Sequence, residues 1–278
     1  MLPPMPLRRL ALLASLAAPL LAAPASADAA TVTSSNWAGY AVSKPGVKFR
    51  RVAATWVQPQ ASCTASGRRR YSAAWLGLGG YHTYSKALEQ IGTEADCTPK
   101  GTPSYSAWYE LVPSAPVDID LTIRPGDTVS ASVTVTGRTV KLYLANRTRG
   151  TVFSKQLTAD SIDVTSAEWI VEAPSACYGN RCDTLPLANF GSATFASARA
   201  TSATGHAGAI NDSAWSATSI ALRSDSGRAF GGGRFASDDG AGGATPGGLT
   251  PTGDGFAVTY EEATATPEPS PPPSQSAS

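Results

Sequence analysis

"TVSASVTVTGRTVKLYLA", residues 128–145, contains the pattern that decides the fold. Apolar and polar side chains alternate on both sides of Gly137, which is typical of two half-buried β-strands joined by a tight turn. The same alternation occurs in "VDIDLTI" (117–123), and Gly126 marks a turn after it. Further predicted strands are 51–57, 71–79, 105–112, 166–174, 216–222 and 255–262. Many short strands separated by turn signals predict an antiparallel β-sandwich or barrel.

The first 27 residues are predicted to be a secretory signal peptide. Arg8 and Arg9 precede an Ala/Leu-rich core, and Ala-Ser-Ala at 25–27 fits a cleavage site. We therefore expect a secreted, extracellular protein. Removal of the two arginines changes the net charge from +1 to −1. This balanced charge gives no argument for a nucleic-acid or membrane partner.

The remaining chain is predicted to form one domain, residues 28–262, followed by a tail. Within it, residues 227–255 are rich in glycine and are expected to form a mobile loop. The tail, residues 263–278, is rich in Pro and Ser and is expected to be disordered because it has too few apolar residues to form a core.

Four cysteines in a secreted chain indicate two disulfides. Cys177 and Cys182 enclose only "YGNR" and are expected to pair, which leaves Cys63 to pair with Cys97. A zinc site is the alternative, but neither pair has the usual spacing and only two histidines exist as further ligands. We expect neither a metal nor a cofactor.

"SAEWIVEAP", residues 166–174, places two glutamates in a predicted strand, although Glu is uncommon in strands. Alternation puts Glu168 and Glu172 on one face, about 13 Å apart at the rise of a strand. A glycosidase pair needs about 5–9.5 Å, so a second catalytic carboxyl has to come from another strand. The available candidates are Glu89, Glu94 and Glu110.

Gln90 offers two amide donors, which suit the stabilisation of a developing oxyanion. Its alternative interpretation is a loop or sheet-edge glutamine. The aromatic residues Trp75, Trp108 and Trp169 are, by the same reasoning, interpreted as core side chains before they are interpreted as ligand platforms.

Six motifs in chain order resemble the glutamic peptidases, or eqolisins, which are secreted acid endopeptidases. They are "SSNWAGY" (34–40), "AAWLGLGG" (73–80), "ALEQIG" (87–92), "YSAWYELVP" (105–113), "AEWIVE" (167–172) and the short loop from Cys177 to Cys182. The resemblance covers most of the chain after the signal peptide. It implies a concanavalin A-like, jelly-roll type sandwich of two packed curved sheets with a concave substrate groove.

The resemblance implies catalytic roles for Glu172 and Gln90. The ionised glutamate activates a water molecule that attacks the scissile carbonyl, and the glutamine amide stabilises the tetrahedral oxyanion. The protonated glutamic acid then passes its proton to the leaving amine. The expected activity is endopeptidase cleavage of polypeptide substrates at acid to mildly acid pH, by a monomer.

The resemblance also assigns substrate contacts to Trp37, Trp75, Gly92, Tyr109 and Glu110. Structural packing is the alternative for each of these residues.

Three residues depart from the family pattern. Gly79 and Ser106 stand where fungal members carry acids, and Glu94 stands where an Asp is expected. Fewer carboxylates near the catalytic pair lead us to expect a higher working pH than that of the fungal enzymes.

Two other functions remain open at the level of sequence, because fold alone does not decide function. One is a non-catalytic lectin-like or peptide-binding module. The other is a glycoside hydrolase that pairs Glu172 with Glu110. Gln90 discriminates between a peptidase and a glycosidase, because a peptidase needs the amide of Gln90 whereas a glycosidase needs a second carboxyl at close range.

Overall fold

The structure, a computed structural model, describes residues 30–178, 181–223 and 242–262. The predicted signal peptide and the predicted Pro/Ser-rich tail lie outside these residues. Within them, no helix is long and apolar enough to cross a membrane.

The described residues form β-strands connected by turns and loops. The strands are β1 (Ala30–Ser34), β2 (Trp37–Ser43), β3 (Phe49–Val57), β4 (Ala73–Gly79), β5 (Leu88–Cys97), β6 (Pro103–Val112), β7 (Val117–Ile119), β8 (Thr128–Thr136), β9 (Thr139–Asn146), β10 (Thr151–Thr158), β11 (Ser166–Glu172), β12 (Ser175–Tyr178), β13 (Arg181–Thr184), β14 (Ser192–Ser202), β15 (Ala207–Ala209), β16 (Ser216–Leu222), β17 (Gly243–Pro246) and β18 (Phe256–Glu261).

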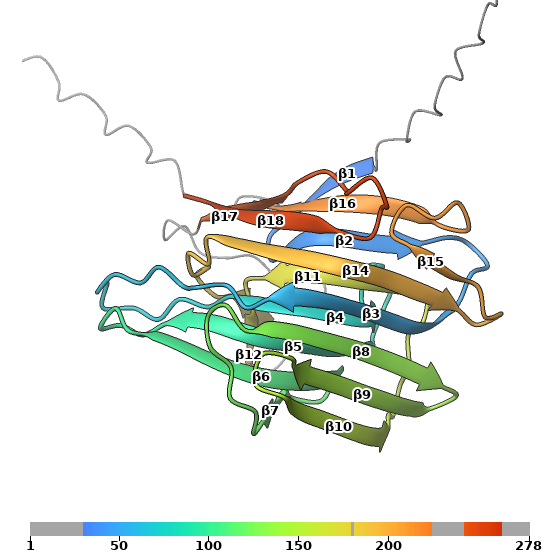
Figure 1. Cartoon of the computed structure of the whole chain (residues 1–278), viewed down its shortest axis with the longest axis horizontal. Helices are drawn as coiled ribbons and strands as arrows, with labels where there is room; N and C mark the ends of the chain where they lie inside the picture. The colour runs from blue at the N-terminus through green and yellow to red at the C-terminus, as the bar shows by residue number, and fades with distance from the viewer. Residues whose placement is uncertain (1–29, 179–180, 224–241, 263–278) are drawn as a thin grey trace, which may run out of the picture.

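One long sheet folds over on itself to make the two layers of a sandwich. Hydrogen bonding runs continuously in the order β10-β9-β8-β3-β14-β18-β17-β16-β2-β11-β4-β5-β6-β7. The first layer, β10 to β18, lies in front of the second, β16 to β7, and β17 joins them at one edge (Figure 1). Contacts of β3 with β4 and of β8 with β5 hold the layers face to face. The predicted all-β sandwich is confirmed.

The main core lies between the layers and follows from the alternation of side chains. Ala167, Trp169 and Val171 of β11 point into it, with Leu76 of β4 and Trp56 of β3. The side chains between them on β11 point to the opposite face of the second layer. The strands of the second layer therefore carry alternate side chains on the face that points away from the main core, and the candidate site lies on this face.

A smaller apolar cluster covers that opposite face. It is formed by Trp37, Ala41, Ala73, Trp75, Leu88, Trp108, Ile170 and Ile220. We call this side of β2, β11, β4, β5 and β6 the site face. Burial of large aromatic groups here, away from the main core, keeps the strand positions rigid around the polar residues among them.

The sequence analysis did not predict β1, β2, β5, β10 and β15 as strands, and three further parts of the prediction need correction. Strand 117–123 ends at Ile119, because Leu121 turns back to donate its backbone N–H to the Ile119 carbonyl. β14 was missed because its small residues carry little pattern, and its pairing with β3 shifts register around Ser197 at φ 52°. Part of the predicted glycine-rich loop, Gly243–Pro246, is β17, which pairs with β16 and β18; residues 227–241 lie outside the described part.

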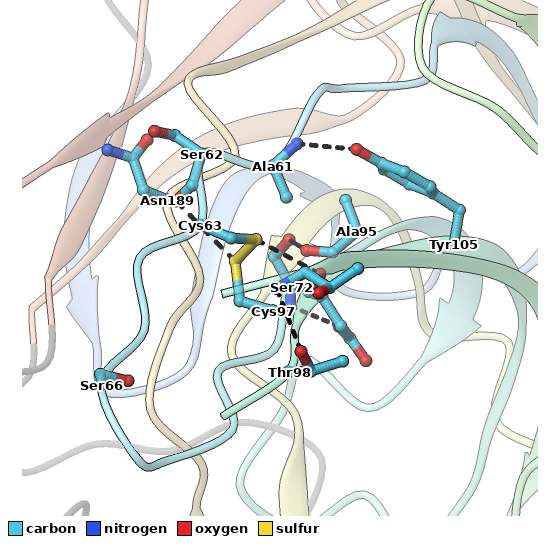
Figure 2. The surroundings of a disulfide bond; sticks show 12 residues. Ala61, Ser62, Cys63, Ser66, Ser72, Ala95, Cys97, Thr98, Tyr105 and Asn189 are labelled. Atoms are coloured by element: carbon cyan, nitrogen blue, oxygen red, sulfur yellow. Dashed lines mark hydrogen bonds between the residues drawn. A yellow bond between two sulfur atoms is a disulfide. The ribbon is translucent and has the colours of Figure 1, made fainter. Parts of the chain in front are cut away.

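The disulfide between Cys63 and Cys97 is confirmed, with its Cα atoms 5.4 Å apart (Figure 2). It ties the loop before β4 to the end of β5. Beside it, the backbone N–H of Ala61 donates to the Tyr105 hydroxyl at 3.3 Å. The cross-link therefore fixes the loop against the strand that carries Gln90.

Cys177 and Cys182 stand directly opposite each other in the β12–β13 pair. Their side chains lie outside the described part of the structure, so the second disulfide stays a prediction.

Candidate active site

Glu172 ends β11 on the site face and is surrounded by hydrogen-bond donors. Trp75 Nε1 donates to its Oε2 at 2.7 Å, and Asn36 Nδ2 donates to its Oε1 at 3.3 Å. The nearby indole of Trp37 also favours the charged form. Trp37 and Trp75 meet edge to face with ring centroids 5.0 Å apart, so each fixes the other. A carboxylate with several N–H donors is suited to hold a negative charge while buried.

The segment "SSNWAG" (34–39) explains why these donors are in place. Ser34 Oγ accepts the backbone N–H groups of Asn36 and Trp37, which shapes the turn between β1 and β2. The same hydroxyl donates to Asn36 Oδ1 at 2.9 Å. Because Oδ1 is occupied, the amide nitrogen of Asn36 is the end that faces Glu172.

Two glycines make room for the site. A β-carbon at Gly39, which has φ +146°, would lie 2.1 Å from the Trp169 carbonyl oxygen, so β2 reaches β11 only with glycine there. A β-carbon at Gly92 would lie 2.5 Å from that of Trp75. Gly92, predicted as a substrate contact, is therefore the space into which Trp75 packs.

Gln90 is buried in β5 and is held by Glu110 of β6. Gln90 Nε2 donates to Glu110 Oε2 at 2.6 Å, and the two residues are register partners. Gln90 Oε1 is buried and has no hydrogen-bond partner among the described residues. The bond fixes where the amide lies but leaves its acceptor unsatisfied.

The strand register places the two predicted catalytic residues on one diagonal of the site face. One row runs through Glu168, Gly77, Gln90 and Glu110, on β11, β4, β5 and β6. Glu172 is four residues further along β11, and Trp75 lies in the intermediate row on the intermediate strand. Glu172 and Gln90 therefore flank Trp75.

Burial dominates the electrostatics of the site. It raises the pKa of Glu172 to about 8, and the negative charge of Glu110 is the next cause. The N–H groups of Trp75, Trp37 and Asn36 act in the opposite direction. Burial also raises the pKa of Glu110, whereas the hydrogen bond from Gln90 lowers it.

Glu168 shares the face of Glu172 but not its surroundings. It is fully buried, and neither of its oxygens has a partner in hydrogen-bonding geometry among the described residues. Burial raises its pKa well above the ordinary value, the nearby hydroxyl of Ser166 acts in the opposite direction, and the carboxyls of Asp163 and Glu89 raise it further. Exposure at the edge of the site, one of its two expected placements, is excluded.

The other predicted residues divide between the two faces. Tyr109 points into the main core, where it stacks on Phe153 and its hydroxyl accepts a hydrogen bond from Lys155 Nζ at 2.9 Å. Its predicted place along the groove is therefore wrong. Glu89 also alternates away from Gln90, and its Oε1 accepts the Asp163 N–H at 3.4 Å.

Glu94 lies on the site face, two residue positions beyond Gly92. The Ser106 hydroxyl donates to its carboxyl. Burial and the nearby charge of Asp118 raise its pKa. Of the three carboxyls considered as partners for Glu172, Glu110 is the one whose charge acts on it.

One residue of the site was missed at the level of sequence, and another was interpreted there only as a core side chain. Asn36 stands between Ser35 and Trp37 in a motif that was recognised, and its amide was the available signal. Trp108 is buried on the site face, two residues before Glu110. Strict alternation from Glu110 would have put it there.

No group of three or more potential metal ligands occurs among the described residues. On the site face, Glu172 bonds with Asn36 and Trp75, and Gln90 bonds with Glu110.

Comparison with known proteins adds a family to this geometry. Residues 35–227 match the model of the Peptidase A4 family. The chain belongs to this family. Aspergillopepsin-2 from Aspergillus niger is 31% identical over 192 residues, which are 61% of this chain and 65% of that protein. The chain thus matches just under two thirds of the length of this relative.

Solved structures of Peptidase A4-like folds agree with the architecture. Scytalido-glutamic peptidase, determined with a peptide-based transition-state analogue, has a TM-score of 0.61 and 27% identity, over 81% of this chain and 98% of that one. SCP-B, an eqolisin in complex with the tripeptide Ala-Ile-His, has a TM-score of 0.58 and 26% identity, over 81% and 98%. Aspergilloglutamic peptidase from Aspergillus niger has a TM-score of 0.52 and 28% identity, over 69% and 99%.

Gly79, one of the departures from the expected family pattern, packs closely against another segment of the chain. A β-carbon at Gly79 would lie 2.6 Å from the β-carbon of Asp163, in the loop before β11. Asp163 therefore occupies the space that a side chain at position 79 would need. Hydrogen bonds from Ser85 and Thr165 lower its pKa.

Proposed function

We propose that this protein is a secreted endopeptidase that cleaves polypeptides at acid to mildly acid pH. The observation that carries the proposal is the carboxyl of Glu172, half-buried on the site face and hydrogen-bonded by Asn36 Nδ2 and Trp75 Nε1. Membership of the chain in the Peptidase A4 family supports peptide hydrolysis as the reaction. The peptide-based ligands of the similar solved structures support polypeptide substrates.

In the proposed mechanism Glu172 is the general base. Its ionised carboxyl takes a proton from a water molecule that attacks the scissile carbonyl, and then gives this proton to the leaving amine. Gln90 donates an amide N–H to the tetrahedral oxyanion. The carboxyl of Glu172 needs rigid support because small misplacements of a base are costly, and the indoles of Trp37 and Trp75 provide it.

The raised pKa of Glu172 bears directly on this mechanism. Burial, the largest cause, raises this pKa to about 8, whereas the N–H groups of Trp75, Trp37 and Asn36 favour the ionised carboxyl that the mechanism needs. Because the charge of Glu110 is one cause of that value, protonation of Glu110 lowers the pKa of Glu172. The pair therefore has to be treated as one titrating unit.

The test compares cleavage of an unfolded protein by the native protein and by Glu172→Gln from pH 3 to 7, with fragments read by mass spectrometry. We expect a loss of about 10²–10⁴-fold in rate for Glu172→Gln, the range for a general base. Asp160→Asn is the matched control, because this change from carboxyl to amide lies on a fully exposed side chain. Absence of cleavage by the native protein at every pH would instead support a non-catalytic binding module.

A further inference from the structure

The loop between β4 and β5 carries a stack of aromatic rings that the proposed mechanism does not use. The rings belong to Tyr81, His82 and Tyr84, and we call residues 80–85 the aromatic loop. The rings of Tyr81 and His82 meet edge to face with their centroids 5.2 Å apart. Those of His82 and Tyr84 stack with centroids 5.0 Å apart and 7° between their planes. The three side chains therefore form one continuous aromatic surface.

The base of the aromatic loop lies against the site face. Gly79 and Gly80 have φ angles of +85° and +83°, a left-handed conformation that lets the chain turn sharply after β4. A β-carbon at Gly80 would lie 3.3 Å from Cη2 of Trp37, and Tyr81 packs on the apolar cluster to which Trp37 belongs. Because the indole of Trp37 favours the charged form of Glu172, the loop adjoins the surroundings of the proposed base.

Hydrogen bonds at the base of the aromatic loop hold its rings in place. The Gly80 N–H donates to Ser85 Oγ at 3.1 Å, and the Ser85 N–H donates to the His82 carbonyl at 2.9 Å. The Ser85 hydroxyl also bonds to the carboxyl of Asp163, in the loop before β11. A surface that is ordered before a ligand arrives loses less conformational entropy on binding.

Tyr84 is the end of the stack that faces solvent. Of the Trp, Phe and Tyr side chains whose burial the structure describes, Tyr84 alone is exposed, with 70% of its surface accessible. The ring of His82 covers one side of it, so the other side is open to a ligand. Aromatic rings attract one another at centroid distances of about 4.5–7 Å, in the geometries that the loop already shows. The open side of Tyr84 therefore suits a further aromatic ring.

We propose that the aromatic loop is a substrate subsite, in which the ring of Tyr84 binds an aromatic side chain of the polypeptide near the scissile bond. The inference rests on the proposed function and deepens it, because it names the preferred substrates. These are polypeptides with Phe, Tyr or Trp at one fixed position relative to the cleaved bond. The alternative occupant is an acidic side chain bound by Lys86, which is exposed two residues after Tyr84.

The activity test measures cleavage of a synthetic peptide library by the native protein, Tyr84→Ala and Tyr84→Phe, with products read by mass spectrometry. We expect the native protein to prefer aromatic residues at one position. Tyr84→Ala is expected to lose about three- to ten-fold in kcat/KM on those peptides, mostly through KM, because the contact is remote from the reacting atoms. Peptides with Ala at that position are cut equally by both proteins, and Tyr84→Phe keeps the preference.

Tyr143→Ala is the matched control for this test. Tyr143 lies on β9 of the first layer, on the face opposite to the buried side chains of Leu142 and Leu144. We expect its removal to leave the substrate preference unchanged. An equal loss in Tyr84→Ala on aromatic and Ala peptides would overturn the proposal, as would a native preference for acidic residues at the position that Tyr84 controls.

A binding measurement decides the proposal even if the protein proves not to cleave peptides. The probes are acetyl-Ala-Ala-Phe-Ala-Ala-amide and its all-Ala counterpart, added to Glu172→Gln while NMR follows the ring signals of His82 and Tyr84. We expect the Phe peptide to shift these signals and to bind about three- to ten-fold more tightly than the all-Ala peptide. Equal effects of the two peptides, or none, would overturn the proposal. Preferential binding of the Phe peptide without cleavage by the native protein would overturn only the proposed function.

Discussion

Glu168 and Glu172 lie on the same face of the same strand, yet their surroundings differ. Trp75 Nε1 and Asn36 Nδ2 donate hydrogen bonds to the half-buried carboxyl of Glu172, whereas Glu168 is fully buried and neither of its oxygens is in hydrogen-bonding geometry with a described residue. Burial raises the pKa of both carboxyls, and nearby donors act in the opposite direction on each, with Ser166 doing so for Glu168. The hydrogen bonds from Trp75 and Asn36 therefore distinguish Glu172 and lower the cost of its charge.

The end of β11 that carries Glu168 lies among acidic side chains, and the folded state is more stable at low pH, where the buried ones are protonated. Burial, the largest cause, raises the pKa of Glu89 to about 9, and the charge of Asp163 raises it as well. The charges of Asp163 and Glu89 both add to the effect of burial on Glu168. Protonated carboxyls can stay buried at a small cost in free energy, whereas burial of a charged carboxylate without a partner has a large cost. The Glu168 end therefore makes the stability of the fold depend on pH, whereas the Glu172 end has the hydrogen-bond donors that suit a general base.

Trp75→Phe has the largest expected effect on the difference between Glu172 and Glu168. It removes the 2.7 Å hydrogen bond to Glu172, so the surroundings of this carboxyl become more like those of Glu168. The pKa of Glu172 rises further, so we expect about 10²-fold less cleavage at pH 5, comparable to the loss of a strong hydrogen bond to a charged group. The measurement is the pH profile of kcat/KM.

Trp169→Phe is the matched control for that change. Its indole donates to the Ala53 carbonyl at 3.0 Å in the main core, so the variant loses stability without altering the shape of the pH profile. An identical change of pH profile in both variants would show that the Trp75 bond to Glu172 has no special role.

Glu89→Gln and Glu168→Gln test whether the buried acids near Glu168 make the free energy of unfolding depend on pH. A pKa raised on folding gives stability that is complete below the unfolded value of 4.5 and is lost as the pH rises toward the folded value. For Glu89 the loss between pH 4.5 and pH 7 is roughly 3 kcal/mol, at 1.36 kcal/mol per unit. We expect urea unfolding to show this loss in the native protein and a smaller loss in each variant.

Asp160→Asn again serves as the exposed control for these stability measurements. A free energy of unfolding that falls equally between the two pH values in the native protein and in both buried variants would rule out the acid cluster as the cause.

Tyr109→Phe has the smallest expected effect and tests which face this residue serves. Removal of the hydroxyl costs the bond to Lys155, about 1 kcal/mol of stability. Because Tyr109 points into the main core, we expect kcat/KM to stay within about two-fold, a change below 0.5 kcal/mol. A large rise in KM would return Tyr109 to the substrate groove.

The sequence predicted what depends on local pattern. Alternation in 128–145 gave β8 and β9, and motif order gave the positions of Glu172 and Gln90 on one face. The partners of these residues depend on register between strands far apart in the chain. The pairing of β11 with both β2 and β4, for example, brings Asn36 and Trp75 to Glu172.

Errors of prediction came from elements whose burial is set by the tertiary fold. Tyr109 lies between Trp108 and Glu110, and the motif assigned it to the groove although alternation places it on the opposite face. The small residues of β14 and the glycine of β17 lack a strand pattern, and pairing with neighbours supplies their order.

The most direct test of the difference between Glu168 and Glu172 is a ¹³C NMR titration of their carboxyls, assigned with the two Gln variants. We expect Glu172 to ionise at a lower pH than Glu168, and Trp75→Phe to narrow the difference between the two pKa values. Ionisation of Glu168 at the same pH as Glu172, or at a lower one, would show that hydrogen-bond donors do not distinguish the two carboxyls.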